Sequence, residues 1–168
     1  MTKPRILMFH GKEGSPNGRK STYLKNNPKY LINVPSYPSN SGDVEKVFPI
    51  CLDIAKRELH DFRPDVVIGS SFGGGILLQL ITAGLWRGPS LFLAQAGVKY
   101  GIANILPAEV PSILVHGTAD TIIQVEDSAQ LANSSANARL IKIADGHSLR
   151  TLCDGLFDLC IDYLLLKR

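Results

Sequence analysis

The stretch Val66-Val67-Ile68-Gly69-Ser70-Ser71-Phe72-Gly73 decides how the chain folds around one serine. Its apolar start is typical of a buried strand, and the apolar spacing from 74 to 85 predicts a helix directly afterwards. The pentapeptide between them reads G-x-S-x-G with Ser71 at its centre, which is the pattern of a nucleophile elbow. Because such a turn is tight, Gly69 and Gly73 are expected to be positions where no side chain fits. The alternative is a small-residue turn that only packs a helix against a sheet.

Length and composition predict one domain with an ordinary core. The chain has 168 residues, of which 45% are hydrophobic and 20% charged, and a chain of this size needs no disulfides to fold. The net charge of +3 is mild, and basic residues are scattered apart from a small cluster at Lys12, Arg19 and Lys20. We therefore expect no nucleic-acid-binding surface.

The sequence predicts a cytoplasmic protein. No apolar run approaches the roughly 18 residues of a membrane span, and the run from 6 to 9 is too short for a signal peptide. The cysteines Cys51, Cys153 and Cys160 are odd in number and lack C-x-x-C spacing. We expect them to be reduced, buried and structural.

Short apolar runs alternate with amphipathic stretches along the chain. The runs predict strands over 5–9, 30–34, 65–68, 90–93, 112–116 and 140–143, and the stretches predict helices over 49–60, 74–85, 125–133 and 148–166. Pro49 is expected in the first turn of its helix, where proline is tolerated. The stretch 94–111 lacks an amphipathic face and is expected to be a long loop or a broken helix. The alternation predicts a three-layer α/β sandwich with about six parallel strands.

A serine hydroxyl needs a base, and the base needs a group that fixes its tautomer. Groups of this kind lie beyond the carboxyl ends of the strands in open α/β sheets. Asp120 follows the predicted strand 112–116, and His147 follows the strand 140–143. The chain order Ser71, Asp120, His147 is the order found in α/β-hydrolases.

Other interpretations of these residues remain open at this stage. Asp120 could instead cap the following turn, as aspartate commonly does, and His147 could be an incidental loop histidine. Asp127 competes for the acid role but is expected inside a helix and facing solvent. Asp145 precedes His147 by two residues and is expected to point elsewhere.

Backbone amides are needed to bind the oxyanion that forms when serine attacks a carbonyl. One should be the amide of Phe72, directly after the nucleophile. The other should come from the loop after the first strand, where Gly11 allows a close turn and the Lys12 amide is the best candidate. The neighbouring amide of Glu13 is the second choice.

These motifs together carry a family resemblance. The segments Phe9-His10-Gly11, Gly69-Ser70-Ser71-Phe72-Gly73-Gly74, His116-Gly117-Thr118-Ala119-Asp120 and Gly146-His147 span most of the chain. The chain resembles a minimal α/β-hydrolase, similar to the small lid-less serine hydrolases that include YqiA-like esterases and RBBP9-like proteins. The resemblance implies that the usual N-terminal hairpin and cap domain are missing. Some hydrolases carry their acid after the fourth strand, but this chain has Gln95 there, which favours Asp120.

The sequence therefore predicts a serine hydrolase that cleaves an ester or thioester of a small molecule by acyl transfer. No cofactor, metal, nucleic acid or membrane is expected to take part, and nothing indicates a protein partner. Ile102, Ile105 and Leu106 are candidate walls of the substrate pocket, although packing over the sheet edge would explain them equally well. The alternatives are an amidase or peptidase with the same triad, or a hydrolase-fold module that binds a protein.

Overall fold

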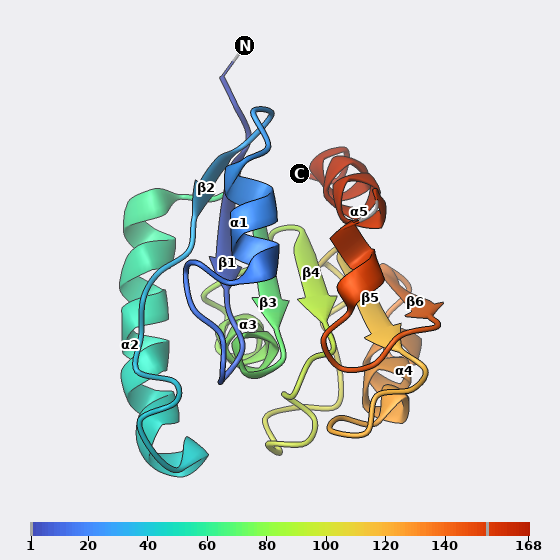
Figure 1. Ribbon diagram of the computed structural model, residues 1–168. Coiled ribbons are helices and arrows are strands. Elements are labelled where there is room, and N and C mark those ends of the chain that lie inside the picture. The colour runs from blue at the N-terminus through green and yellow to red at the C-terminus, as the bar shows by residue number, and fades with distance from the viewer. Residues whose placement is uncertain (1, 154) are drawn as a thin grey trace.

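The computed structural model describes residues 2–153 and 155–168 and contains one six-stranded sheet (Figure 1). All neighbouring strands pair in parallel, in the order β2-β1-β3-β4-β5-β6. The strands are β1 (Arg5–Phe9), β2 (Leu31–Asn33), β3 (Val66–Ser70), β4 (Ser90–Leu93), β5 (Ser112–Gly117) and β6 (Ala138–Ile143). The predicted α/β sandwich with six parallel strands is confirmed.

Helices cover both faces of the sheet. One face carries α2 (Val44–Phe62), α3 (Phe72–Thr82) and α4 (Val125–Asn133), and the other carries α1 (Arg19–Lys25), the 3₁₀ turn Arg150–Cys153 and α5 (Leu156–Leu165). Figure 1 shows α1 and α5 in front of the sheet, with α3 and α4 behind it. Alternate residues of β1 supply the two cores: Leu7 and Phe9 face α2 and α3, while Ile6 and Met8 face the α1 side. The central strands are therefore buried on both faces, as a parallel sheet requires.

Three helix predictions need correction. The sequence interpretation missed α1, which is only seven residues long and buries just two of them. Helix α2 begins at Val44, so Pro49 lies inside the helix rather than in its first turn. The helix expected over 148–166 is interrupted by Gly155, whose φ of 103° lies in the left-handed region, and α5 begins only after it.

The buried cysteines differ in part from expectation. Cys51 and Cys160 are buried, and burial raises the pKa of the Cys160 thiol to about 11. Cys153 is only half-buried. Within the described residues, no helix combines the length and the apolar character needed to cross a bilayer.

The order in which strands are added to the sheet reverses beside β1, although all strands remain parallel. The chain moves from β1 outward to β2 and then returns to form β3 on the other side of β1. Loops leaving β1 and β3 therefore diverge at their carboxyl ends and leave a crevice, which is where open α/β sheets bind ligands. Ser71 follows β3 directly, so the serine lies at this switch point.

Candidate active site

Ser71 occupies a strained turn between β3 and α3. Its φ of 51° and ψ of −112° are unusual for a residue with a side chain, and such strain is found mainly at functional sites. A Cβ built on Gly69 would lie 2.5 Å from the carbonyl oxygen of Gly73, and one built on Gly73 would overlap the carbonyl of Phe9. The two glycines therefore allow a turn tight enough to expose the serine, as the sequence motif predicts.

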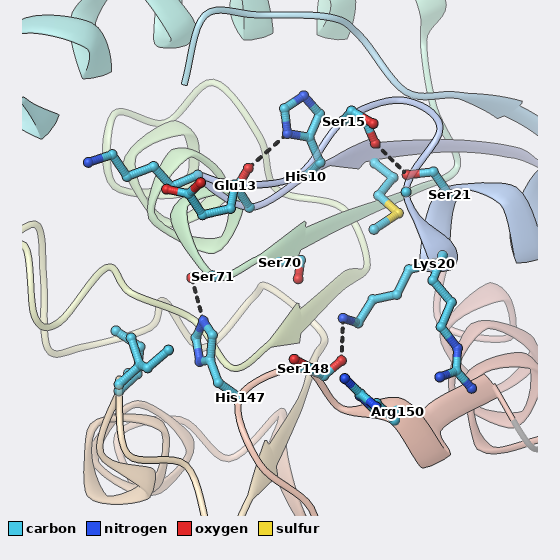
Figure 2. A pocket seen from close by; sticks show the side chains of 18 of the residues that line it. His10, Glu13, Ser15, Lys20, Ser21, Ser70, Ser71, His147, Ser148 and Arg150 are labelled. Atoms are coloured by element: carbon cyan, nitrogen blue, oxygen red, sulfur yellow. Dashed lines mark hydrogen bonds between the residues drawn. The ribbon is translucent and has the colours of Figure 1, made fainter. Parts of the chain in front are cut away.

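One line of hydrogen bonds joins three side chains from three different loops. Ser71 Oγ lies 2.9 Å from His147 Nε2, a contact drawn in Figure 2. On the other side of the ring, His147 Nδ1 lies 2.7 Å from Asp120 Oδ2. Since the carboxylate can only accept, Nδ1 donates to Asp120 and Nε2 is left to accept the serine proton. The structure thus brings together the serine, histidine and aspartate that the sequence singled out.

The two oxygens of Asp120 have separate partners. Oδ2 binds His147, while Oδ1 accepts hydrogen bonds from the amides of Ile122 and Ile123 at 2.8 and 2.9 Å. Asp120 therefore also caps the turn, as the alternative interpretation of the sequence proposed, and it does so through Oδ1. Burial of this side chain opposes its ionisation, but the bonds from the Ile123 amide, His147 and the Ile122 amide outweigh burial and lower the pKa of Asp120. The carboxylate is therefore held in its charged form, which is the form that orients the imidazole.

The competing carboxylates lie in other surroundings. Asp127 is inside α4. Asp145 accepts bonds from the Gly146 amide and from the amide and hydroxyl of Thr151. These bonds, with Thr151 first, lower the pKa of Asp145. Of the acids that the structure describes, Asp120 alone is bonded to His147.

A second histidine, which is not among the candidate catalytic residues of the sequence, also contacts Asp120. His116 is completely buried, with Nε2 3.1 Å from Asp120 Oδ2 and 3.1 Å from the carbonyl of Ile123. Its Nδ1 lies 2.7 Å from the hydroxyl of Ser128 on α4. With Ser128 donating to Nδ1, Nε2 donates to the Ile123 carbonyl and lies close to Asp120 Oδ2. The sequence signal for this contact was the four-residue spacing between His116 and Asp120, which becomes informative only once the turn after β5 is known.

The loop after β1 lies against the elbow. A Cβ built on Gly11 would lie 3.5 Å from the Cβ of Ser71. The loop is held in place by His10, whose Nδ1 donates to the Gly11 carbonyl at 2.9 Å, and by Ser39, whose hydroxyl donates to the Lys12 carbonyl at 2.7 Å. Burial lowers the pKa of His10, which favours the neutral ring. Lys12 lines the cleft together with Ser71. Phe72 opens α3, where amides have no acceptor within the helix.

The cleft beside Ser71 and His147 has a volume of about 700 Å³. Its apolar lining includes Met8, Tyr100, Ile122 and Ile123. The expected walls at Ile102, Ile105 and Leu106 do not line it: Leu106 is 1% exposed within the core, while Ile105 is 63% exposed. Ile102 packs beside Tyr100 over α3. The alternative reading as packing residues is the better one for Ile102 and Leu106, because the loop 94–111 folds back onto α3.

Across residues 2–153 and 155–168, no three His, Cys, Asp or Glu side chains are grouped so that they could hold a metal ion.

A serine on a strained strand–helix turn, bonded to a histidine beyond a later strand of a parallel sheet, defines the class of α/β serine hydrolases. The model of the serine hydrolase family FSH1 matches residues 47–151, more than half of the chain. The chain belongs to this family and is a hydrolase. A search of curated protein sequences finds no relative.

Solved structures share the fold over nearly the whole chain. A candidate hydrolase of the alpha/beta superfamily from Xanthomonas campestris pv. campestris has 24% identity and a TM-score of 0.70, covering 96% of this chain and 98% of that one. Mouse alpha/beta hydrolase domain-containing protein 10 has 18% identity and a TM-score of 0.72, covering 97% and 91%. Est1E from Butyrivibrio proteoclasticus, solved with ferulic acid, has 15% identity and a TM-score of 0.72, covering 98% and 89%. At these identities the similarity supports the α/β-hydrolase fold.

Proposed function

We propose that Ser71, His147 and Asp120 form a catalytic triad that hydrolyses a carboxylic ester or thioester of a small molecule. The observation that carries this proposal is the continuous line of hydrogen bonds from Ser71 Oγ through the imidazole to Asp120 Oδ2. The strained elbow supports it, because backbone strain at a residue with a side chain is found mainly at functional sites. The Est1E structure with ferulic acid shows that the same fold accepts a small carboxylic acid in that protein.

In the first step, Ser71 Oγ attacks the carbonyl carbon while His147 Nε2 takes the hydroxyl proton. The charge that develops on the ring is offset by Asp120, and the new oxyanion is bound by the amides of Phe72 and Lys12. When the tetrahedral intermediate collapses, the bond to the alcohol or thiol breaks, and His147 returns the proton to that leaving group. The acyl group is then carried on Ser71.

In the second step, water attacks the acyl-serine with the same histidine as base. The carboxylic acid leaves, and the proton returns to Ser71 Oγ. Hydrolysis of an amide would follow the same course, but it requires protonation of a poorer leaving group. A panel of esters, thioesters and aminoacyl amides separates these substrates, and we expect measurable kcat/KM for the first two.

Covalent labelling tests the nucleophile directly. Intact-mass analysis after treatment with a fluorophosphonate should show one adduct on the wild type and none on Ser71→Ala. The neighbouring Ser70→Ala is the matched control, because it removes the same atom one position away and should still be labelled. Labelling that disappears with Ser70 rather than Ser71 would contradict the elbow assignment, and absence of both labelling and turnover would favour a module that only binds a partner.

A further inference from the structure

The cleft beside Ser71 is strongly basic, although the chain as a whole is nearly balanced. The chain has 18 Lys and Arg residues against 15 Asp and Glu residues. Five basic residues and a single acidic one line the cleft: Lys12, Arg19, Lys20, Lys99 and Arg150, with Glu13. More than a quarter of the positive charge is thus gathered around one cavity, which concentrates a positive potential there.

The five basic side chains are not neutralised by the protein. In the part of the chain that the structure describes, none of them forms an ion pair. Lys20 Nζ and Lys99 Nζ donate instead to the neutral carbonyls of Ser148 and Ile122, at 2.7 and 2.8 Å. Lysines elsewhere do pair, as Lys46 does with Asp43. The positive charge of the cleft is therefore available to a ligand.

Lys20 connects this charge to the reaction centre. It extends from α1, is half-buried, and binds the carbonyl of Ser148, the residue directly after His147 (Figure 2). An ammonium has three donors, and this bond uses one of them. Burial lowers the pKa of Lys20, because its charge is incompletely solvated. The influences of Cys153 and Asp145 oppose burial but are smaller than it. An anion beside Lys20 would restore the missing stabilisation.

The surroundings of Lys20 suit a carboxylate or a phosphate. Figure 2 shows Ser70, Lys20, Ser148 and Arg150 along one wall of the cleft, next to Ser71 and His147. Ser70 and Ser148 are the chain neighbours of the two reacting residues, and consecutive Cα atoms are only about 3.8 Å apart. Ammonium, guanidinium and hydroxyl groups are the usual donors to acidic oxygens. The acidic group of a bound substrate would therefore be separated from its scissile carbonyl by only a few covalent bonds of the substrate.

We propose that the hydrolase selects esters or thioesters carrying a negatively charged group, a carboxylate or a phosphate, which Lys20, Arg150 and Ser70 bind. The proposal rests on the proposed function and specifies its substrate class. A competing explanation is that Lys20 only fixes the loop that carries His147. That explanation predicts equal losses for charged and neutral substrates, whereas an anion site predicts a loss confined mainly to charged ones.

The test uses three coumarin esters with the same alcohol: the hexanoate, the hexanedioate monoester and a matched ester ending in a phosphonate. We expect the wild type to prefer an acidic ester in kcat/KM. Lys20→Met and Arg150→Gln should each lower kcat/KM for that ester roughly 10- to 100-fold more than for the hexanoate, as expected for a hydrogen bond to a charged group. Lys142→Gln is the control, because it removes the same charge from β6, outside the cleft. Whichever acidic ester responds more identifies the anion as carboxylate or phosphate.

Binding to Ser71→Ala, which should leave the esters intact, separates this proposal from the proposed function. Calorimetry should show tighter binding of an acidic ester than of the hexanoate, with the difference lost when Lys20→Met is added. Turnover without any acidic preference, or equal losses for charged and neutral esters, would overturn the anion site and leave the proposed function standing. Lys20-dependent binding without turnover by the wild type would do the reverse. Neither turnover nor acid-selective binding would overturn both.

Discussion

At the residue scale, Asp120 combines two interactions that the sequence offered as alternatives. One carboxylate oxygen closes the turn after β5 through two amides, and the other fixes the ring of His147. The turn and the candidate acid are therefore one structure, and the position of the acid is set by backbone hydrogen bonds. His116 is fully buried, and its Nε2 lies 3.1 Å from the same carboxylate oxygen that binds His147.

This geometry predicts that Asp120→Asn lowers kcat by about 10⁴ while substrate binding changes little, because the amide favours the wrong tautomer of the histidine. The turn should survive, since the amide oxygen still accepts from Ile122 and Ile123. Steady-state kinetics on any ester that the wild type cleaves measures the effect. Asp127→Asn, the same change on α4, should alter kcat by less than about twofold; the opposite pattern would show that the acid is misassigned.

At this scale, the sequence predicts the positions of those site residues that directly follow a predicted strand. Ser71, Asp120 and His147 each follow a predicted strand, so parallel strands with aligned ends place them together. The expected substrate walls at Ile102, Ile105 and Leu106 do not directly follow a predicted strand. Their positions depend on how the loop 94–111 packs over α3, which local pattern does not determine. The sequence shows Lys12, Arg19 and Lys20 as a small basic cluster, but local pattern does not place that cluster in the cleft.

At the scale of elements, the elbow joins β3, α3 and the end of β1 at van der Waals distance. A side chain at Gly73 would overlap the carbonyl of Phe9, and one at Gly69 would strike the backbone of Gly73 and Gly74. The close approach brings the loop after β1 beside Ser71, where the Lys12 amide is the proposed oxyanion donor. The same contact therefore serves the packing of the sheet and the geometry of the site.

Gly73→Ala should consequently destabilise the protein by roughly 3 kcal/mol or more, since backbone atoms of two elements must move to admit the methyl group. Urea unfolding measures the loss, and any folded fraction should show reduced labelling of Ser71. Gly42→Ala is the control, because its Cβ would meet only Val47, at 3.8 Å. A stability for Gly73→Ala within about 0.5 kcal/mol of the control would mean that the elbow is looser than the structure shows.

The helix errors have physical causes that local sequence does not reveal. Pro49 is at the exposed surface of α2, and Val47, Cys51 and Ala55 bury the opposite side of the helix, so tertiary packing outweighs the lost backbone bond. Helix α1 is too short to show a periodic apolar face. The interruption at Gly155 is not visible in the sequence pattern, because the apolar spacing continues on both sides of it.

At the scale of the whole molecule, chain topology assembles the site. Reversal of strand order beside β1 opens the crevice, and loops after β1, β3, β5 and β6 meet at its edge. This arrangement followed from the alternation of strands and helices, so the sheet and the meeting of Ser71, Asp120 and His147 could be predicted from sequence. The shape and charge of the cleft could not, since they depend on α1 and on side chains far apart in the sequence.

The stability of the folded protein at acid pH tests whether the carboxylates of Asp120 and Asp145 are held in their charged form. The native hydrogen bonds lower the pKa values of Asp120 and Asp145. Each carboxylate therefore contributes stability above the pKa of the unfolded chain, which is about 3.9, and the contribution is lost as the pH falls through the lower native pKa. We expect the free energy of unfolding of the wild type to fall more steeply between pH 5 and pH 3 than that of Asp120→Asn or Asp145→Asn, measured by urea titration. Ser71→Ala keeps both carboxylates and should follow the wild-type slope. Parallel slopes for all four proteins would show that the native hydrogen bonds do not favour the charged carboxylates.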